Sequence, residues 1–299
     1  MQNRIQQIVH HYSSKFLLLF VLLCLGGAAQ AEDFLWTVAG KHNRVYLLGS
    51  MHMLPPSAYP LPAAMHSAYQ SSKVLVFETD IGAVNKPENQ KVLLEAGTYP
   101  KGKTLSNSLP GRQLRDFVNI AKELKVPFEM LDNYRPWLAA LTLELSAYMK
   151  QGFQPDLGVD QHFYQKAVRD KKNIITLETI REQTSFFTDM SNSMANDYMA
   201  MTLYHLRDPE DLPEDILDIW LDGDVDDMED YVEDAKDDHP QLYNRFLRDR
   251  NRKWMPVILD LLKQKQNALV VVGALHLAGD DGLLNLLEKA GYRPIQSDD

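Results

Sequence analysis

Two eight-residue stretches decide the fold: VYLLGSMH at residues 45–52 and LVVVGALH at residues 269–276. Each has four apolar residues followed by G-x-x-H, which is typical of a buried strand that ends at the glycine. A second pair, VLVFET at residues 74–79 and IITLET at residues 174–179, predicts two strands that end in Glu-Thr. Because the motifs run in the order G-x-x-H, E-T, E-T, G-x-x-H, we predict pseudo-symmetric halves that meet in one sheet.

Strand-like and helical runs alternate along the rest of the chain. A hairpin is predicted from residues 34–38 and 45–48, joined by a turn at residues 40–43. Short aliphatic runs predict strands at residues 73–77, 173–177 and 268–272, and apolar residues have helical spacing over residues 132–149, 159–169 and 181 to about 263. We therefore predict an α/β (or α+β) fold, with a central mixed β-sheet and a mostly helical insert lobe at about residues 181–263.

Residues 1–31 have the pattern of a secretory signal peptide. Arg4 and Lys15 precede an apolar run, and Ala29-Gln30-Ala31 forms an A-x-A cleavage site. The run is shorter than the roughly 20 residues that span a bilayer, which argues against a permanent anchor. We expect an exported protein, periplasmic or secreted, whose mature chain at residues 32–299 is a single domain with no stable membrane span.

The composition excludes cysteine chemistry in the mature chain and argues against anionic partners. The only cysteine, Cys24, lies in the signal segment, so the mature chain has no disulfide and no cysteine nucleophile. The formal net charge is −10, and loss of Arg4 and Lys15 makes it more negative still. So acidic a surface argues against nucleic acid and anionic lipid as partners.

Polar side chains follow all four motif strands. They are two imidazoles and two carboxylates: His52, Glu78, Glu178 and His276. Because ligands bind beyond the carboxyl ends of strands in open α/β sheets, we expect these side chains to converge on one crevice. The motif glycines, Gly49 and Gly273, would let the chain leave its strand and let a ligand approach closely.

The same residues have structural alternatives. The two histidines could be core residues that cap turns, although buried imidazoles need partners. Glu78 could form a buried ion pair, and Glu178 could merely support the helix start that follows it. Histidine and carboxylate also bind divalent metals and act as acid and base near neutral pH, which favours a functional site.

The chain resembles the TraB/GumN family, which is related to the Tiki metalloproteases and more distantly to the ChaN haem-binding proteins and the erythromycin esterases. The resemblance covers nearly the whole mature chain. It rests on LGSMH at residues 48–52, FETD at 77–80, GVD at 158–160, LET at 177–179 with Gln183, DRN at 249–251 and VGALH at 272–276. It implies that His52, Glu78 and His276 form the active-site set.

The resemblance also changes how three helical residues are interpreted. Alone, Arg250 would belong to a solvated basic face together with Arg245, Arg248, Arg252 and Lys253. By resemblance, Arg250 would contact a carboxylate of the site or of the substrate, and Asn251 would orient a ligand. Asp160 is either a first-turn residue that interacts with the helix dipole or a supporting residue of the site.

Acidic residues are concentrated between residues 208 and 238 and suggest a calcium loop. The spacing of Asp222, Asp224, Asp226 and Glu233 fits EF-hand ligands, but the position that requires glycine is Asp227. We reject this site and predict a turn at residues 222–224 between two peripheral helices whose carboxylates face solvent. The predicted core side of these helices comprises Leu217, Trp220, Leu221, Val225, Met228 and Val232.

Several common catalytic motifs are missing from the sequence, which has no G-x-S-x-G, H-E-x-x-H or G-x-G-x-x-G. We predict a metal-dependent, peptidase-like hydrolase in which His52, His276 and Glu78 bind a divalent ion (Mn, Co, Zn or Fe). Glu78 would be a ligand or general base, and Arg250 would stabilise the oxyanion. The expected substrate is a peptide or another small molecule. The alternatives are a metal-free, esterase-type hydrolase and a non-catalytic haem- or iron-binding protein.

Overall fold

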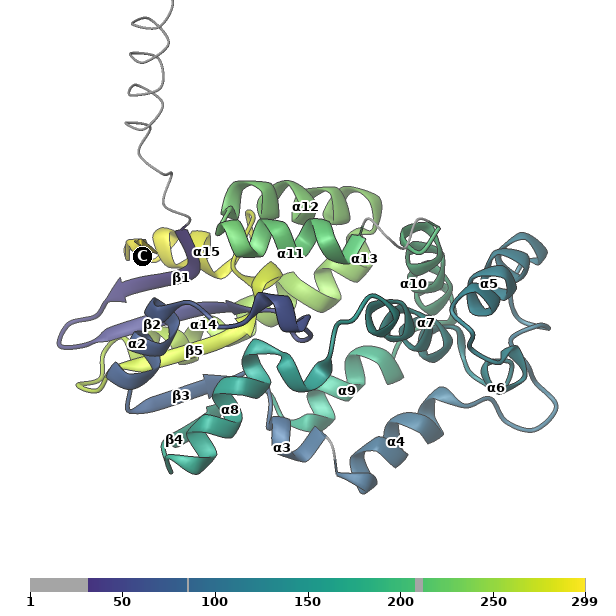
Figure 1. Cartoon of the computed structure of the whole chain (residues 1–299), viewed down its shortest axis with the longest axis horizontal. Helices are drawn as coiled ribbons and strands as arrows, with labels where there is room; N and C mark the ends of the chain where they lie inside the picture. Colours follow the sequence, from purple (N-terminus) through teal and green to yellow (C-terminus); the bar gives the residue numbers. More distant parts are fainter. Residues whose placement is uncertain (1–31, 85, 208–211, 299) are drawn as a thin grey trace, which may run out of the picture.

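A mixed β-sheet with strand order β4-β3-β5-β2-β1-β6 lies toward one end of the molecule, on the left in Figure 1. The computed structural model describes residues 32–84, 86–207 and 212–298, so the predicted signal peptide lies outside the described residues. Within these ranges, no helix is long and apolar enough to cross a membrane. The strands are β1 (Glu32–Ala39), β2 (Arg44–Ser50), β3 (Val74–Phe77), β4 (Asn173–Thr176), β5 (Ala268–Gly273) and β6 (Pro294–Asp298).

The four motif strands form the parallel part of the sheet and are sorted by kind. β2 pairs with β5, β5 with β3 and β3 with β4, all in parallel. The two G-x-x-H strands are therefore neighbours, as are the two Glu-Thr strands. Every residue of β3 and β5 is buried, which explains their continuous apolar sequences.

The predicted hairpin is confirmed by the antiparallel pairing of β1 with β2. The Gly40 N–H donates to the carbonyl of Asn43 at the turn, at 3.0 Å. The Asn43 side chain donates to the carbonyls of Leu261 and Gln266, which ties the turn to the segment before β5. Strand β6 was not among the predicted strands, and it pairs antiparallel with β1 at the edge of the sheet.

Helices pack around the sheet and also form a lobe at one end of it (Figure 1). Those packed in the same apolar cluster as the sheet are α2 (Ala63–Ser71), α8 (Val159–Arg169), α11 (Leu212–Asp222), α12 (Val225–Asp238), α14 (Asp249–Leu261) and α15 (Leu283–Lys289). A second apolar cluster is built mainly by α5 (Gly111–Glu123), α6 (Phe128–Leu131), α7 (Pro136–Lys150) and α10 (Asn192–His205). Shorter or bordering helices are α3 (Ile81–Val84), α4 (Pro87–Gly97), α9 (Ile180–Thr188) and α13 (Pro240–Tyr243).

The helices of the lobe that we predicted at about residues 181–263 are divided between the two apolar clusters. The second cluster combines residues 105–147 with residues 195–206. Helices α11, α12 and α14 instead pack against the sheet. The physical reason is that helical periodicity shows that a helix has an apolar face but does not show which partner covers that face.

The acidic region forms the predicted turn between two helices. Asp224 caps α12, and its side chain accepts from the N–H groups of Asp226 and Asp227, each at 3.0 Å. Among the described residues, no group of three or more acidic, histidine or cysteine side chains is arranged to hold a metal ion. One core prediction is wrong, because Leu221 is 41% exposed.

Gly49 at the end of β2 is required for packing. A Cβ there would overlap the ring of Phe34 and approach the Cα of Ala274 to 3.1 Å. The carbonyl of Gly49 accepts from the indole N–H of Trp220 at 2.8 Å, which fixes the strand end to α11. The need for glycine here comes from close approach within the core.

We expect Gly49→Ala to lower the free energy of unfolding by about 1–3 kcal/mol, because the added methyl group overpacks a buried site. Denaturant unfolding measures the loss. Gly273→Ala is the matched control, since the nearest atom to its Cβ is at 3.4 Å, an ordinary contact. Equal stability of the two variants would show that this packing argument is wrong.

Candidate functional site

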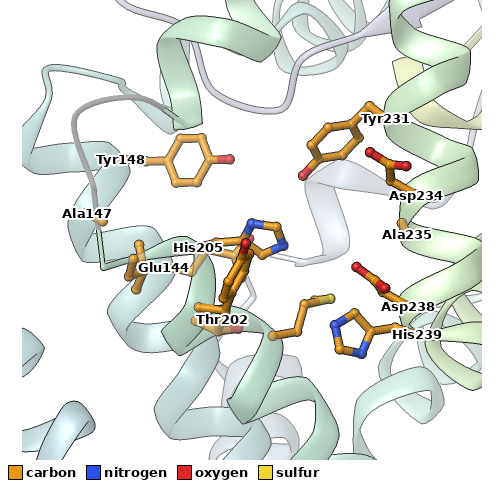
Figure 2. Close-up of a pocket in the computed structure, with 13 residues that line it drawn as sticks. Glu144, Ala147, Tyr148, Thr202, His205, Tyr231, Asp234, Ala235, Asp238 and His239 are labelled. Atoms are coloured by element: carbon orange, nitrogen blue, oxygen red, sulfur yellow. The ribbon is translucent and has the colours of Figure 1, made fainter.

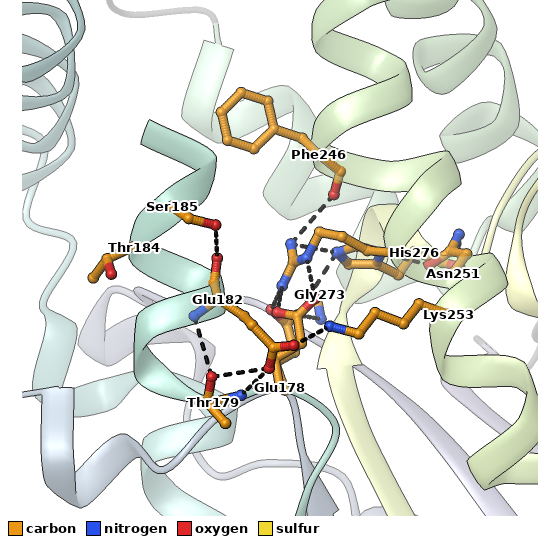
Figure 3. A network of polar contacts seen from close by, with 12 residues as sticks. Glu178, Thr179, Glu182, Thr184, Ser185, Phe246, Asn251, Lys253, Gly273 and His276 are labelled. Atoms are coloured by element: carbon orange, nitrogen blue, oxygen red, sulfur yellow. Dashed lines mark hydrogen bonds and ion pairs between the residues drawn. The ribbon is translucent and has the colours of Figure 1, made fainter. Parts of the chain in front are cut away.

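The carboxyl ends of the parallel strands bring the predicted site residues together. Glu78 directly follows β3, Glu178 lies two residues beyond β4, and His276 ends the short 3-10 helix η4 (Ala274–His276) after β5. Figure 3 shows Glu178, Gly273 and His276 within one network of polar contacts. His52 lies two residues beyond β2, and its Nε2 would be 3.4 Å from a Cβ on Gly273.

Arg250 connects this network and is itself buried. Its Nε and Nη2 donate to the two oxygens of Glu178 at 3.1 and 3.0 Å, and Nη2 also donates to Glu78 Oε2 at 2.5 Å. Its Nη1 donates to the carbonyl of Phe246 and to His276 Nε2, at 3.2 and 3.1 Å. Since a guanidinium has five N–H groups, all five are used. Arg250 therefore clamps the site carboxylates and keeps no free donor for the oxyanion role that we predicted.

His276 is held in one neutral form. Its Nδ1–H donates to Asn251 Oδ1 at 2.6 Å, so its Nε2 is the acceptor that faces Arg250. Burial disfavours the charged imidazole, and Arg250 adds to this effect, so the pKa of His276 falls to about 3. Asn251 donates to the carbonyls of His276 and Asp281 and thus orients a site histidine, whereas we had predicted that it orients a ligand.

The pKa values of the two carboxyl groups are shifted in opposite directions. Burial favours the neutral acid at Glu78, but Arg250 outweighs this effect and holds the pKa of that carboxyl well below its usual range. Glu78 Oε1 also accepts from the N–H of Gly273 at 2.7 Å. At Glu178, burial prevails over Arg250 and raises the pKa. Glu178 does not merely support the helix that follows, because that helix is capped by Thr179 and Glu182.

His52 is paired with Asp160, in the first turn of α8. The His52 Nδ1 and Asp160 Oδ2 atoms are 3.0 Å apart, and 61% of the His52 side chain is exposed. The surrounding protein disfavours the charged imidazole, but the Asp160 carboxylate outweighs it and raises the pKa of His52 to about 9. Asp160 therefore contacts a site residue as well as lying near the helix terminus.

Gly273 leaves a vacant position at the centre of the site. A Cβ on Gly273 would lie 3.4 Å from both Glu78 Oε1 and His52 Nε2, and 3.6 Å from His276 Cδ2. The backbone of Gly273 is extended, so its conformation does not require glycine. Its missing side chain instead keeps open a point that is flanked by a carboxylate and an imidazole.

Two clefts meet at His52 and Arg250. One, of about 370 Å³, lies against α7 and is lined by apolar side chains including Met53, Leu141 and Leu145. The other, of about 420 Å³, runs between α4 and α9 and is lined by Leu93, Phe186 and Phe187, among others. Phe246 borders both clefts. An extended ligand could therefore pass across the site with an apolar group on each side.

A separate cavity of about 280 Å³ lies between α7, α10 and α12 (Figure 2). Figure 2 shows Tyr148 and Tyr231 facing each other across it, with Glu144 below. The Glu144 carboxylate already accepts from Tyr198 at 2.8 Å. None of the residues predicted for the site lines this cavity.

The arrangement does not fit the predicted three-ligand metal site. His276 Nε2, the nitrogen available to a metal, accepts from Arg250. A cation bound among His52, Glu78 and His276 would also lie next to the Arg250 guanidinium. Within the described ranges, no trio of His, Cys, Asp or Glu side chains has the geometry of a metal site.

Two polar residues of the site, Ser50 and Thr79, were not predicted from the sequence. Both are buried, and both line a hollow next to His52 and Glu78. They lie inside the quoted motifs, directly after Gly49 and Glu78, so the motifs did contain a signal. Phe246 carried no comparable signal, because its place in the site depends on how the lobe packs.

The Asp160 contact predicts the titration of His52. We expect the His52 ring protons to titrate near pH 9 by NMR, and nearer the ordinary pKa of 6.5 in Asp160→Asn. A raised pKa means that the pair stabilises the fold fully below pH 6.5 and loses this effect as the pH rises through about 9. Asp160→Asn should therefore destabilise more at pH 6 than at pH 10. An unchanged titration in Asp160→Asn would contradict this pairing.

Comparison with known proteins gives one family and distant relatives. The sequence matches the TraB/PrgY/gumN family over residues 34–296. It is 22% identical to the uncharacterized protein YbaP of Escherichia coli over 278 residues, covering 90% of this chain and 99% of YbaP. It is 24% identical to a Metalloprotease TIKI homolog of Amphimedon queenslandica over 339 residues, covering 93% of this chain and 65% of that protein. No solved structure matches. The chain belongs to the TraB/PrgY/gumN family.

Proposed function

We propose that this protein is a hydrolase of peptide bonds that uses Glu78 as general base and His52 as general acid. The observation that carries the proposal is the vacant position beside Gly273, 3.4 Å from Glu78 Oε1 and from His52 Nε2. A reacting atom there would have a proton acceptor and a proton donor within reach. Water would lose a proton to Glu78 as it attacks the substrate carbonyl. His52 would donate a proton to the developing oxyanion or to the leaving nitrogen.

The protonation states suit this division of roles. The lowered pKa of Glu78 keeps the carboxylate ionised at neutral pH, and the pKa of about 9 keeps His52 protonated. Environments that separate the pKa values of two neighbouring groups are typical of an acid and base pair. The low pKa also limits the strength of Glu78 as a base, so orienting the water would contribute much of its effect.

The other residues position this pair. Arg250 fixes Glu78 through Oε2, and Glu178 fixes the guanidinium from its other side. His276 Nε2 accepts from Arg250, and the Asn251 side chain donates to the carbonyl of His276 in the loop after β5. The two residues therefore fix the position of this loop beside the site. This assigns His276 a positioning role, in place of the metal-ligand role that we predicted from the sequence.

A peptide is the substrate that the clefts support best. Apolar walls on both sides of His52 and Arg250 suit an extended chain with apolar side chains. One relative, whose printed name is a Metalloprotease TIKI homolog, also points to proteolysis. The signal pattern of residues 1–31 supports a role outside the cytoplasm, in the periplasm or the medium.

A metal-dependent hydrolase is the second candidate. The name of that relative supports it, and so does the Asp160–His52 pair, because a carboxylate on Nδ1 is a common partner of a metal-binding histidine. The contact between Arg250 and His276 Nε2 opposes it. A site formed by His52 and Glu78 would be left with only two of the predicted ligands.

We expect Glu78→Gln to lower kcat/KM by about 10²- to 10⁴-fold on a peptide selected from a fluorogenic library, because the general base is lost. Glu182→Gln is the control, since Glu182 is a nearby exposed carboxylate that contacts Thr179 and Lys253. Thermal unfolding of each variant checks that it folds. Activity of Glu78→Gln equal to that of the wild type would exclude Glu78 as the base.

Gly273→Ala tests the vacant position itself. We expect at least a tenfold loss of kcat/KM, because the methyl group occupies the point between Glu78 Oε1 and His52 Nε2. The melting temperature should stay near that of the wild type. If Gly273→Ala were both folded and fully active, the reacting atoms could not lie where we place them.

A further inference from the structure

A third hollow, of about 220 Å³, opens beside His52 and Glu78 on the face of the sheet toward α8. Its polar lining residues are Ser50, His52, Glu78, Thr79, Asp160 and Gln183. Its apolar lining is Phe77, Ile81, Val84 and Val271. The strand registers pair Ser50 with Gly273 and Phe77 with Val271, so the side chains of Ser50, Phe77 and Thr79 emerge on the same face.

Polar atoms in this hollow are buried without partners. Ser50 is 3% exposed and Thr79 is 4% exposed. In the described part of the chain, no hydrogen-bond partner reaches Ser50 Oγ, Thr79 Oγ1 or Asp160 Oδ1. Buried polar atoms are nearly always satisfied, and leaving one unpaired disfavours the fold. Three such atoms beside one hollow indicate a site built to receive a polar group.

The charges around the hollow favour an uncharged ligand. Asp160 is already paired with His52 through Oδ2, and Glu78 is paired with Arg250. A bound anion would face these two carboxylates, and a bound cation would face the protonated His52. An uncharged amide group suits both hydroxyls and the carboxylate, because its carbonyl accepts from O–H groups and its N–H donates to Asp160 Oδ1.

The volume and the apolar lining of the hollow indicate which chemical group is attached to that amide. A volume of about 220 Å³ is much larger than the roughly 30 Å³ of one water molecule. The side chains of Phe77, Ile81, Val84 and Val271 leave room for a small aliphatic group. A valine-sized residue with one of its peptide groups therefore matches both parts of the lining.

We propose that Ser50, Thr79 and Asp160 form a substrate subsite that binds one backbone amide and the small aliphatic side chain next to it, adjacent to the scissile bond. The proposal deepens the proposed peptide hydrolysis by naming residues that determine specificity. Ser50 and Thr79 would donate to the amide carbonyl, and Asp160 would accept from the amide N–H. The burial of unpaired hydroxyls is explained because the ligand supplies their partner.

Binding of N-acetyl-valine amide, followed by NMR, tests the subsite without requiring turnover. We expect saturable binding to the wild-type protein, with an affinity about tenfold lower in Ser50→Ala and in Thr79→Val. Isobutyl acetate, which has a small aliphatic group and a carbonyl but no amide N–H, should bind more weakly than the amide. Thr202→Val is the matched control, because Thr202 is 2% exposed and lines the cavity of Figure 2.

Melting temperatures separate this role from a structural one. Because neither hydroxyl has a partner within the described fold, Ser50→Ala and Thr79→Val should melt no lower than the wild type. Weaker binding with unchanged or raised melting temperature supports the subsite. Absence of binding, or equal binding by the wild type and both variants, overturns it. If the wild type cleaves no peptide but binds the amide as described, the hydrolase proposal fails and the subsite remains.

Discussion

The site depends on one buried cation, the guanidinium of Arg250. A buried positive charge is stable only where anions and acceptors surround it, and Arg250 meets two carboxylates, a carbonyl and an imidazole nitrogen. The same constraint explains why two neighbouring parallel strands both end near a glutamate. Without the cation, Glu78 and Glu178 would be two buried carboxylates close together, and at least one would take up a proton.

The surroundings of the site give residues of the same type different pKa values or different packing roles. Of the two histidines, His276 next to Arg250 stays neutral, while His52 next to Asp160 is charged. Of the two glutamates, Glu78 has a lowered pKa and Glu178 a raised one. The glycines also differ, since Gly49 permits packing against Phe34 and Gly273 leaves space between acid and base. The two halves of the motif pattern are thus similar in sequence but differ in physical role.

The sequence predicted the elements that depend on local pattern. Apolar runs that end in a polar residue identified β2, β3, β4 and β5, and the parallel order of these strands placed their polar residues at one edge. Features that depend on tertiary packing could not be predicted. Three examples depend on partners that are distant in the sequence. They are the use of every N–H group of Arg250 in a hydrogen bond, the orientation of His276 by Asn251 and the packing of the lobe. Ser50 and Thr79 were visible in the motifs, but only the fold shows that their hydroxyls lack partners.

We propose that residues clamped by Arg250, and not a bound metal ion, provide the chemistry. The direct test is the rate of peptide hydrolysis after exhaustive chelation, with the metal content of the same sample measured by mass spectrometry. We predict an unchanged rate in protein that contains far less than one equivalent of metal. Loss of activity in chelator, with recovery on addition of Mn, Co, Zn or Fe in the divalent state, would contradict it. That result would require Arg250 to leave His276 when the metal binds.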